Sequence, residues 1–96
     1  MMQCWLYIAS EGTFNDEYSL HATLQGALLK AIQEIYEWLE DASDSHYHEM
    51  DIINAHMSGL KDKKTEELKR IFCYFSDLAE DHINIWVHIR PIDMEP

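Results

Sequence analysis

Basic residues are scarce in this sequence of 96 residues. Seven Lys and Arg stand against 18 Asp and Glu, so the formal net charge at pH 7 is −11 with His neutral. Proteins that bind DNA, RNA or anionic lipid do so through a cationic surface that replaces counterions on the phosphates. The charge balance therefore excludes direct nucleic-acid binding and membrane-surface binding as expected functions.

Cysteine is nearly absent as well. Cys4 and Cys73 lie in separate apolar segments without C-x-x-C spacing, a pattern that favours buried free thiols over a disulfide or a metal site. No segment approaches the about 20 apolar residues that cross a bilayer. The N-terminal segment lacks the basic leader and the long apolar run of a signal peptide. We therefore expect a cytoplasmic protein.

Apolar residues are plentiful. Hydrophobic residues make up 47% of the chain and aromatic residues 11%, which is enough apolar area to offset chain entropy and excludes a disordered chain. A chain of this length cannot build two cores, so residues 1–96 are expected to form a single domain.

Segments with strand-like composition occur at both ends of the chain. Residues 3–9 and 83–89 are rich in β-branched and aromatic residues with alternating polarity, and both predict strands. A short strand over 18–22 is expected to pair with the first as a hairpin. Pro91 predicts that the last strand either ends there or lies at a sheet edge.

Three segments between these strands have apolar residues at helical spacing. They predict helices over 24–42 with Thr23 as N-cap, over 46–58 with Gly59 at its end, and over 65–80. The expected fold is α+β, a small two-layer domain. An antiparallel sheet of two or three strands from both chain ends would pack against two or three helices.

Acidic residues gather in the first expected helix and just after it. Between Lys30 and Lys61 the sequence has seven acids and neither Lys nor Arg. A row of carboxylates on a helix imitates the phosphates of nucleic acid in sign and coarse spacing, and steers basic grooves towards itself. The simple alternative is a solvated helix face. The candidate partner-binding residues are Glu34, Glu37, Glu40, Asp41, Asp44, Glu49 and Asp51.

A second candidate surface lies on the predicted sheet. By alternation, we expect the aliphatic residues of the outer segments to face the helices, namely Leu6, Ile8, Ile85, Val87 and Ile89. The opposite face then carries Trp5, Tyr7, Trp86 and His88. Aromatic residues gathered on a surface indicate a homodimer or a second partner interface. The alternative is that the loop containing Phe14 covers this face.

No motif predicts catalysis or a cofactor. His46, His48 and His56 do not have the spacing of H-E-x-x-H, which favours surface histidines, although a metal site at these residues is a third hypothesis. The sequence has no nucleophile elbow, and its three glycines form no phosphate-binding loop. Neither cysteine has an electropositive setting. We therefore expect a protein that is not an enzyme and needs no cofactor or metal.

The order of segments resembles that of small acidic phage-encoded anti-defence proteins, including anti-CRISPR proteins. The resemblance lies in the first strand (WLYIAS), the Thr-started helix (HATLQGALLKAI) and the closing strand (WVHIRPID). It implies a non-enzymatic inhibitor that binds a host nuclease or effector complex and blocks access of nucleic acid, and it assigns no individual residue. The alternative function is an interaction or assembly module that uses the aromatic sheet face, with acidity serving solubility.

Overall fold

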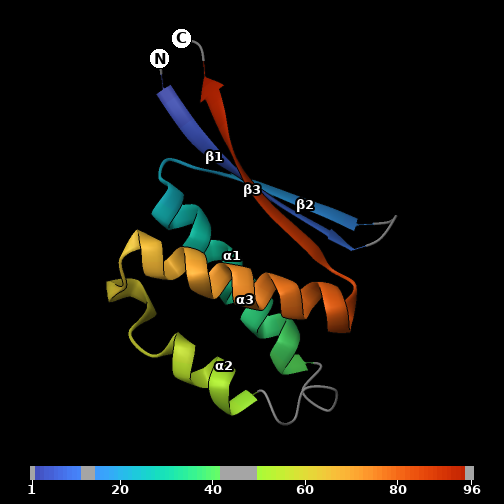
Figure 1. Cartoon of the computed structure of the whole chain (residues 1–96). Helices are drawn as coiled ribbons and strands as arrows, with labels where there is room; N and C mark the ends of the chain where they lie inside the picture. Colours follow the sequence, from blue (N-terminus) through green and yellow to red (C-terminus); the bar gives the residue numbers. More distant parts are fainter. Residues whose placement is uncertain (1, 12–14, 42–49, 95–96) are drawn as a thin grey trace.

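The computed structural model describes residues 2–11, 15–41 and 50–94 (Figure 1). These residues form an antiparallel sheet with helices on one face, which confirms the expected α+β domain. The elements in chain order are β1 (Met2–Glu11), β2 (Asn15–His21), α1 (Leu24–Asp41), α2 (Met50–Met57), a short 3₁₀ turn (Leu60–Asp62), α3 (Thr65–Ile83) and β3 (Trp86–Met94).

The sheet joins both ends of the chain. Its order is β2-β1-β3 with β1 in the centre, and both pairings are antiparallel. Tyr7 of β1 lies between Ser19 of β2 and Ile89 of β3. The last strand does not end at Pro91 but continues to Met94. Because β3 is an edge strand, the missing N–H of Pro91 is tolerated there.

The turn between α3 and β3 explains why the last strand begins later than predicted. The helix continues to Ile83 and ends at Asn84, which has a positive φ of 55°. The N–H of Ile85 then donates to the carbonyl of Ala79 at 3.2 Å, a bond typical of helix ends with a left-handed residue. The chain therefore enters β3 at Trp86.

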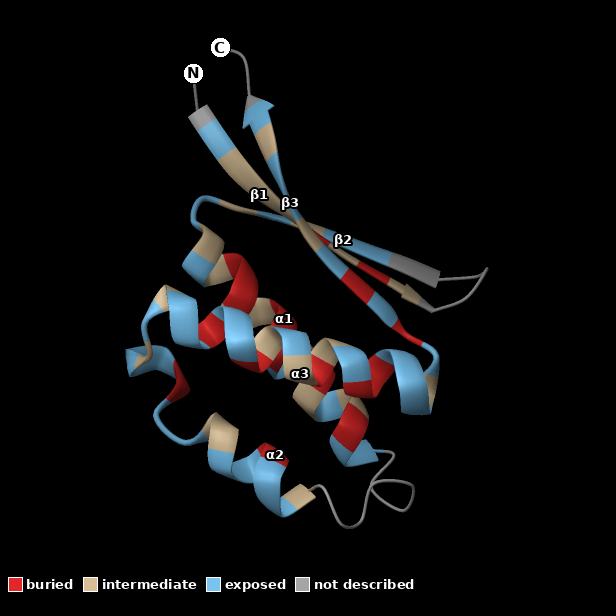
Figure 2. Cartoon of the chain, in the orientation of Figure 1, coloured by how far each residue is buried: buried red, intermediate tan, exposed pale blue. Residues whose placement is uncertain are grey.

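The core lies between the sheet and the layer formed by α1 and α3, where the buried residues of both helices meet (Figure 2). Gln25 Nε2 donates to the carbonyl of Lys63 at 3.5 Å, which joins the first turn of α1 to the segment just before α3. The two helices also end on the same side of the molecule, so they run in roughly the same direction (Figure 1). The predicted apolar stripes are confirmed by the buried residues Ala27, Leu28, Ala31, Ile32, Ile35 and Leu39 of α1, and Leu68, Ile71, Phe75, Leu78 and Ala79 of α3.

The short helix α2 lies on the side of α1 and α3 away from the sheet (Figure 1). Ile53 is fully buried, and the hydroxyl of Tyr36 in α1 donates to Asn54 Oδ1 at 2.6 Å. The predicted helix over 46–58 is confirmed over Met50–Met57, and residues 46–49 lie outside the described residues.

The two cysteines are free, but one of them is exposed. Cys4 is half-buried, whereas Cys73 lies on the solvent side of α3, so the expectation of a buried thiol was wrong there. Its neighbours in sequence are apolar, but the helical period puts Ile71 and Phe75 in the core and turns Cys73 away from it. Among the described residues, no helix is long and apolar enough to cross a bilayer.

Thr23 caps α1 as predicted. Its Oγ1 accepts a hydrogen bond from the N–H of Gly26 at 3.0 Å, satisfying a donor that the first helical turn leaves unpaired. We expect Thr23→Ala to lower the free energy of unfolding by about 1 kcal/mol, as measured by urea denaturation. Thr23→Ser retains the acceptor and should stay close to the parent. Equal losses in both variants would contradict the capping role.

Candidate interaction surfaces

The acidic residues predicted to bind a partner separate into three groups. Glu37, Glu40 and Asp41 are exposed on α1, and Asp51 is exposed on α2. Asp44 and Glu49 lie outside the described residues. Glu34, the remaining residue, is half-buried against the sheet.

Glu34 joins α1 to the sheet. Its Oε2 accepts a hydrogen bond from the hydroxyl of Tyr7 at 2.5 Å, and its Oε1 lies 2.6 Å from Lys30 Nζ. Burial alone would raise the pKa of Glu34, but the hydrogen bonds from Lys30 and Tyr7 outweigh burial and hold that pKa below its usual value. Glu34 is therefore already occupied within the fold, and we remove it from the partner-binding set.

The Tyr7–Glu34 contact predicts a loss of stability at high pH. Burial raises the pKa of Tyr7 well above its usual range, and the hydrogen bond to Glu34 and the charges of Glu34 and Glu17 add to the effect. A pKa raised in the folded state gives stability that is complete below the unfolded pKa of about 10 and is lost as the pH rises above it. Urea midpoints at pH 8 to 11 should fall less steeply in Tyr7→Phe than in the parent. In the control Tyr36→Phe, the urea midpoint should still fall with pH almost as steeply as in the parent. If the midpoint of Tyr7→Phe falls as steeply as that of the parent, the loss of stability does not come from ionisation of Tyr7.

The C-terminal parts of α1 and α3 both carry exposed acids. The two helices run in the same direction, so these ends lie at the same end of the helical layer (Figure 1). None of the seven Lys and Arg of the chain lies in the C-terminal half of either helix. We call the exposed carboxylates there the acidic helix ends: Glu37, Glu40 and Asp41 of α1, and Asp77, Glu80 and Asp81 of α3.

The position of four of these carboxylates is unfavourable for stability. Glu40, Asp41, Glu80 and Asp81 lie in the last turn of a helix, where the partial negative charge of the helix end disfavours each acid by about 0.3–1 kcal/mol. Helix α1 has no acid in its first turn and no base in its last turn, the reverse of the stabilising arrangement. Five of the seven basic residues lie between 61 and 70, near the opposite helix ends. Side-chain charges and helix dipoles therefore add to one negative field at the acidic helix ends.

Sequence reasoning missed the contribution of α3 to this surface. Asp77, Glu80 and Asp81 were not assigned a role because the acidic row was followed along the first helix only. Two of these residues, Glu80 and Asp81, lie in the last turn of α3. Acids in the last turn of a predicted helix are the signal that could have identified them.

The residues of β1 lie on the opposite sheet faces from those predicted. Tyr7 is only 1% exposed and faces the helices together with Ala9, so Leu6 and Ile8 point the other way. Trp5 is half-buried and shares the side of Tyr7 by alternation. The expected outward positions of Trp5 and Tyr7 were therefore wrong. The physical reason is the contact with Glu34, which gives the buried Tyr7 hydroxyl a partner.

No helix among the described residues covers the other face of the sheet, which is largely apolar (Figure 1). Phe14, whose loop is the alternative cover for this face, lies outside the described residues. For β3 and the residue before it the prediction was correct, since Ile85 and Val87 are buried and Trp86 and His88 are exposed. The register aligns outward residues in rows across the three strands. We call this set the outer sheet face, and its members with described side chains are Cys4, Leu6, Ile8, Ser10, Tyr18, Leu20, Trp86, His88, Arg90 and Ile92. Tyr18 is 62% exposed, Leu20 55% and Trp86 37%.

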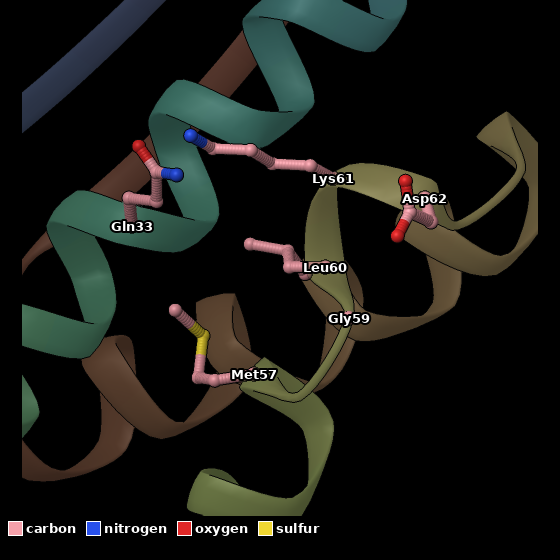
Figure 3. A pocket seen from close by; sticks show the side chains of 6 residues that line it. All are labelled: Gln33, Met57, Gly59, Leu60, Lys61 and Asp62. Carbon is pink, nitrogen blue, oxygen red and sulfur yellow. The ribbon is translucent and has the colours of Figure 1, made fainter.

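A pocket of about 380 Å³ lies between α1 and the turn after α2, and it is open to solvent (Figure 3). The Lys61 side chain extends towards Gln33, whereas Asp62 points away. The lining residues are Gln33, Met57, Gly59, Leu60, Lys61 and Asp62, a set without a nucleophile and base in partnership. Ser19 Oγ and His21 Nε2 do lie 2.8 Å apart, but they are on β2 and outside this pocket.

The described residues form no metal site. They contain no group of three His, Cys, Asp or Glu side chains that could hold an ion. The ring of His56 instead packs 5.5 Å from the ring of Tyr74 and 6.3 Å from that of Phe75. His46 and His48, the other members of the metal hypothesis, lie outside the described residues.

Comparisons with known proteins give no family for this chain. No protein-family model, curated protein or solved structure matches it. The acidic helix ends and the outer sheet face are therefore the features from which a function can be inferred.

Proposed function

We propose that the protein is a non-enzymatic inhibitor whose acidic helix ends occupy the basic nucleic-acid-binding surface of a partner protein. The observation that carries this proposal is the placement of six exposed carboxylates at the C-terminal ends of two parallel helices. Four of the six lie in a last helical turn, where the helix dipole disfavours them, so their charge serves something other than folding.

Most of these carboxylates are available to a partner. Among the described residues, no Lys or Arg forms an ion pair with the acidic helix ends, whereas Glu66 and Glu67 near the start of α3 pair with Lys69 and Lys63. A basic groove can therefore contact the acidic helix ends without breaking ion pairs inside the protein. The net charge of −11 also accelerates the approach of a basic partner.

This function agrees with what the resemblance to phage anti-defence proteins implies. A groove that binds phosphates presents Lys and Arg at short intervals, and carboxylates compete for the same side chains. A protein that acts in this way blocks nucleic acid by occupancy and needs no turnover. Its binding must weaken as salt screens the charges.

The test is capture of partners on the immobilised protein, followed by washes with salt and with duplex DNA. We expect the captured proteins to be nucleic-acid-binding proteins that are released by high salt and also by DNA at low salt. Release by DNA is the stricter criterion, because it requires competition for the same groove. Capture that survives both washes would overturn the proposal.

A further inference from the structure

The outer sheet face differs in charge from the rest of the molecule. Its members include Arg90 and His88, and the register gives it a single acid, Asp16, opposite Ser10, although the chain as a whole carries a net charge of −11. Its apolar members span all three strands, with Tyr18 and Leu20 on β2, Leu6 and Ile8 on β1, and Trp86 on β3. Apolar patches of this kind on small proteins mark interfaces.

The edges of the sheet are poorly suited to adding a further strand. In β3, Pro91 has no N–H to donate and interrupts the edge. In β2, the acid Glu17 lies on the other edge strand, and charged residues oppose strand pairing between molecules. The face of the sheet, and not its edge, is therefore the surface open to association.

We propose that the outer sheet faces of two copies of this chain pack against each other in a homodimer. The two sheets would form the centre of a four-layer assembly, with a helical layer on each outer side. The interface would be isologous, so the same apolar rows contribute from both copies.

Charge favours a second copy as the occupant. Two molecules of this net charge repel each other, and contact through the helical layers would bring their acidic helix ends together. Contact through the sheets places the helical layers on opposite sides of the dimer. The sheet spacing of about 10 Å, with a helical layer beyond each sheet, then separates the two acidic surfaces by more than the Debye length of about 8 Å. A basic partner gains nothing at this face, since Arg90 would repel it.

The size of the face is adequate for a dimer of moderate affinity. The strands of ten, seven and nine residues lie within a flat area of at most about 33 by 14 Å. Protruding side chains such as Tyr18 and Leu20 increase the accessible area above that flat value. This approaches the about 600 Å² per partner at the lower limit of stable interfaces.

The test is sedimentation equilibrium of the purified full chain from about 1 to 100 μM, the range expected for a moderate interface. We expect a mass twice the 11.3 kDa of the monomer at the upper concentrations. Leu20→Lys should lower the association constant at least tenfold, and Tyr18→Lys should do the same. The matched control is Ile52→Lys, because Ile52 is 53% exposed but lies on α2, away from the face. Far-UV circular dichroism checks that the variants are folded.

Three results would overturn the inference. The first is a monomer throughout this concentration range. The second is a dimer that Leu20→Lys and Tyr18→Lys leave intact. The third is a dimer that Ile52→Lys weakens as much as the two sheet-face variants do. A monomer whose sheet face binds a different protein also contradicts it. The inference does not depend on the proposed function, because Leu20→Lys leaves the acidic helix ends intact and should still capture partners in a salt-sensitive way.

Discussion

Replacing Glu40, Asp41, Glu80 and Asp81 with their amides is expected to raise the free energy of unfolding by about 1–3 kcal/mol. All four lie in the last turn of a helix, where the dipole disfavours negative charge. For a domain of this size, each kcal/mol raises Tm by about 4–8 °C. Urea denaturation of the parent and the amide variant measures the change. A gain in stability with a loss of partner binding is typical of residues retained for function.

A variant of equal charge separates position from net charge. Asp62→Asn, Glu66→Gln, Glu67→Gln and Asp93→Asn also remove four charges, so both variants have a net charge of −11 + 4 = −7. Glu66 and Glu67 lie in the first turn of α3, where the dipole favours them. We therefore expect the control to be no more stable than the parent. An equal gain in both variants would assign the effect to general repulsion.

Replacing Phe75 with alanine is expected to destabilise the domain by about 3–5 kcal/mol. Phe75 is fully buried in α3, and its ring lies 5.9 Å from that of Tyr74 and 6.3 Å from that of His56 in α2. The substitution therefore leaves a cavity and weakens one of the contacts between α2 and α3. Small domains have total stabilities near the lower part of the usual range of about 5–15 kcal/mol, so much of the protein should unfold.

The control for this prediction is Phe72→Ala, on the same helix. Phe72 is only half-buried, so less apolar area leaves the core, and we expect a loss of less than half that of Phe75→Ala. Circular dichroism during urea denaturation measures both. Similar losses at the two positions would show that the core is not centred on Phe75.

The helices could be predicted from sequence because local rules determine them. Thr23 provides a capping oxygen, and the apolar period of α1 and α3 leaves one face for the core. The strands at both chain ends were also recognisable from β-branched and aromatic residues. Their boundaries were less predictable, since Asn84 extends α3 at the expense of the expected last strand.

The sequence could not predict which residues of β1 face the helices, because both faces of the strand are apolar. The segment QCWLYIA gives alternation no polar face to place in water. The choice depends on Tyr7, whose hydroxyl reaches Glu34, 27 positions further along the chain. The same contact removes Glu34 from the acidic surface. A tertiary hydrogen bond thus changed both candidate surfaces.

Only the residues of α1 in the acidic helix ends could be predicted from the sequence. Glu37, Glu40 and Asp41 followed from the absence of basic residues after Lys30. Asp77, Glu80 and Asp81 join them only because α1 and α3 run in the same direction. The relative direction of two helices separated by more than twenty residues is a tertiary property, so the combined surface required the structure.

The most direct test of the central claim is the affinity of a captured partner for the two variants of equal charge. We predict that the variant with amides at Glu40, Asp41, Glu80 and Asp81 binds at least tenfold more weakly than the parent, a loss of about 1.4 kcal/mol. The control variant should bind within about threefold of the parent. Equal weakening of both variants, or no weakening of the first, would contradict a partner site at the acidic helix ends.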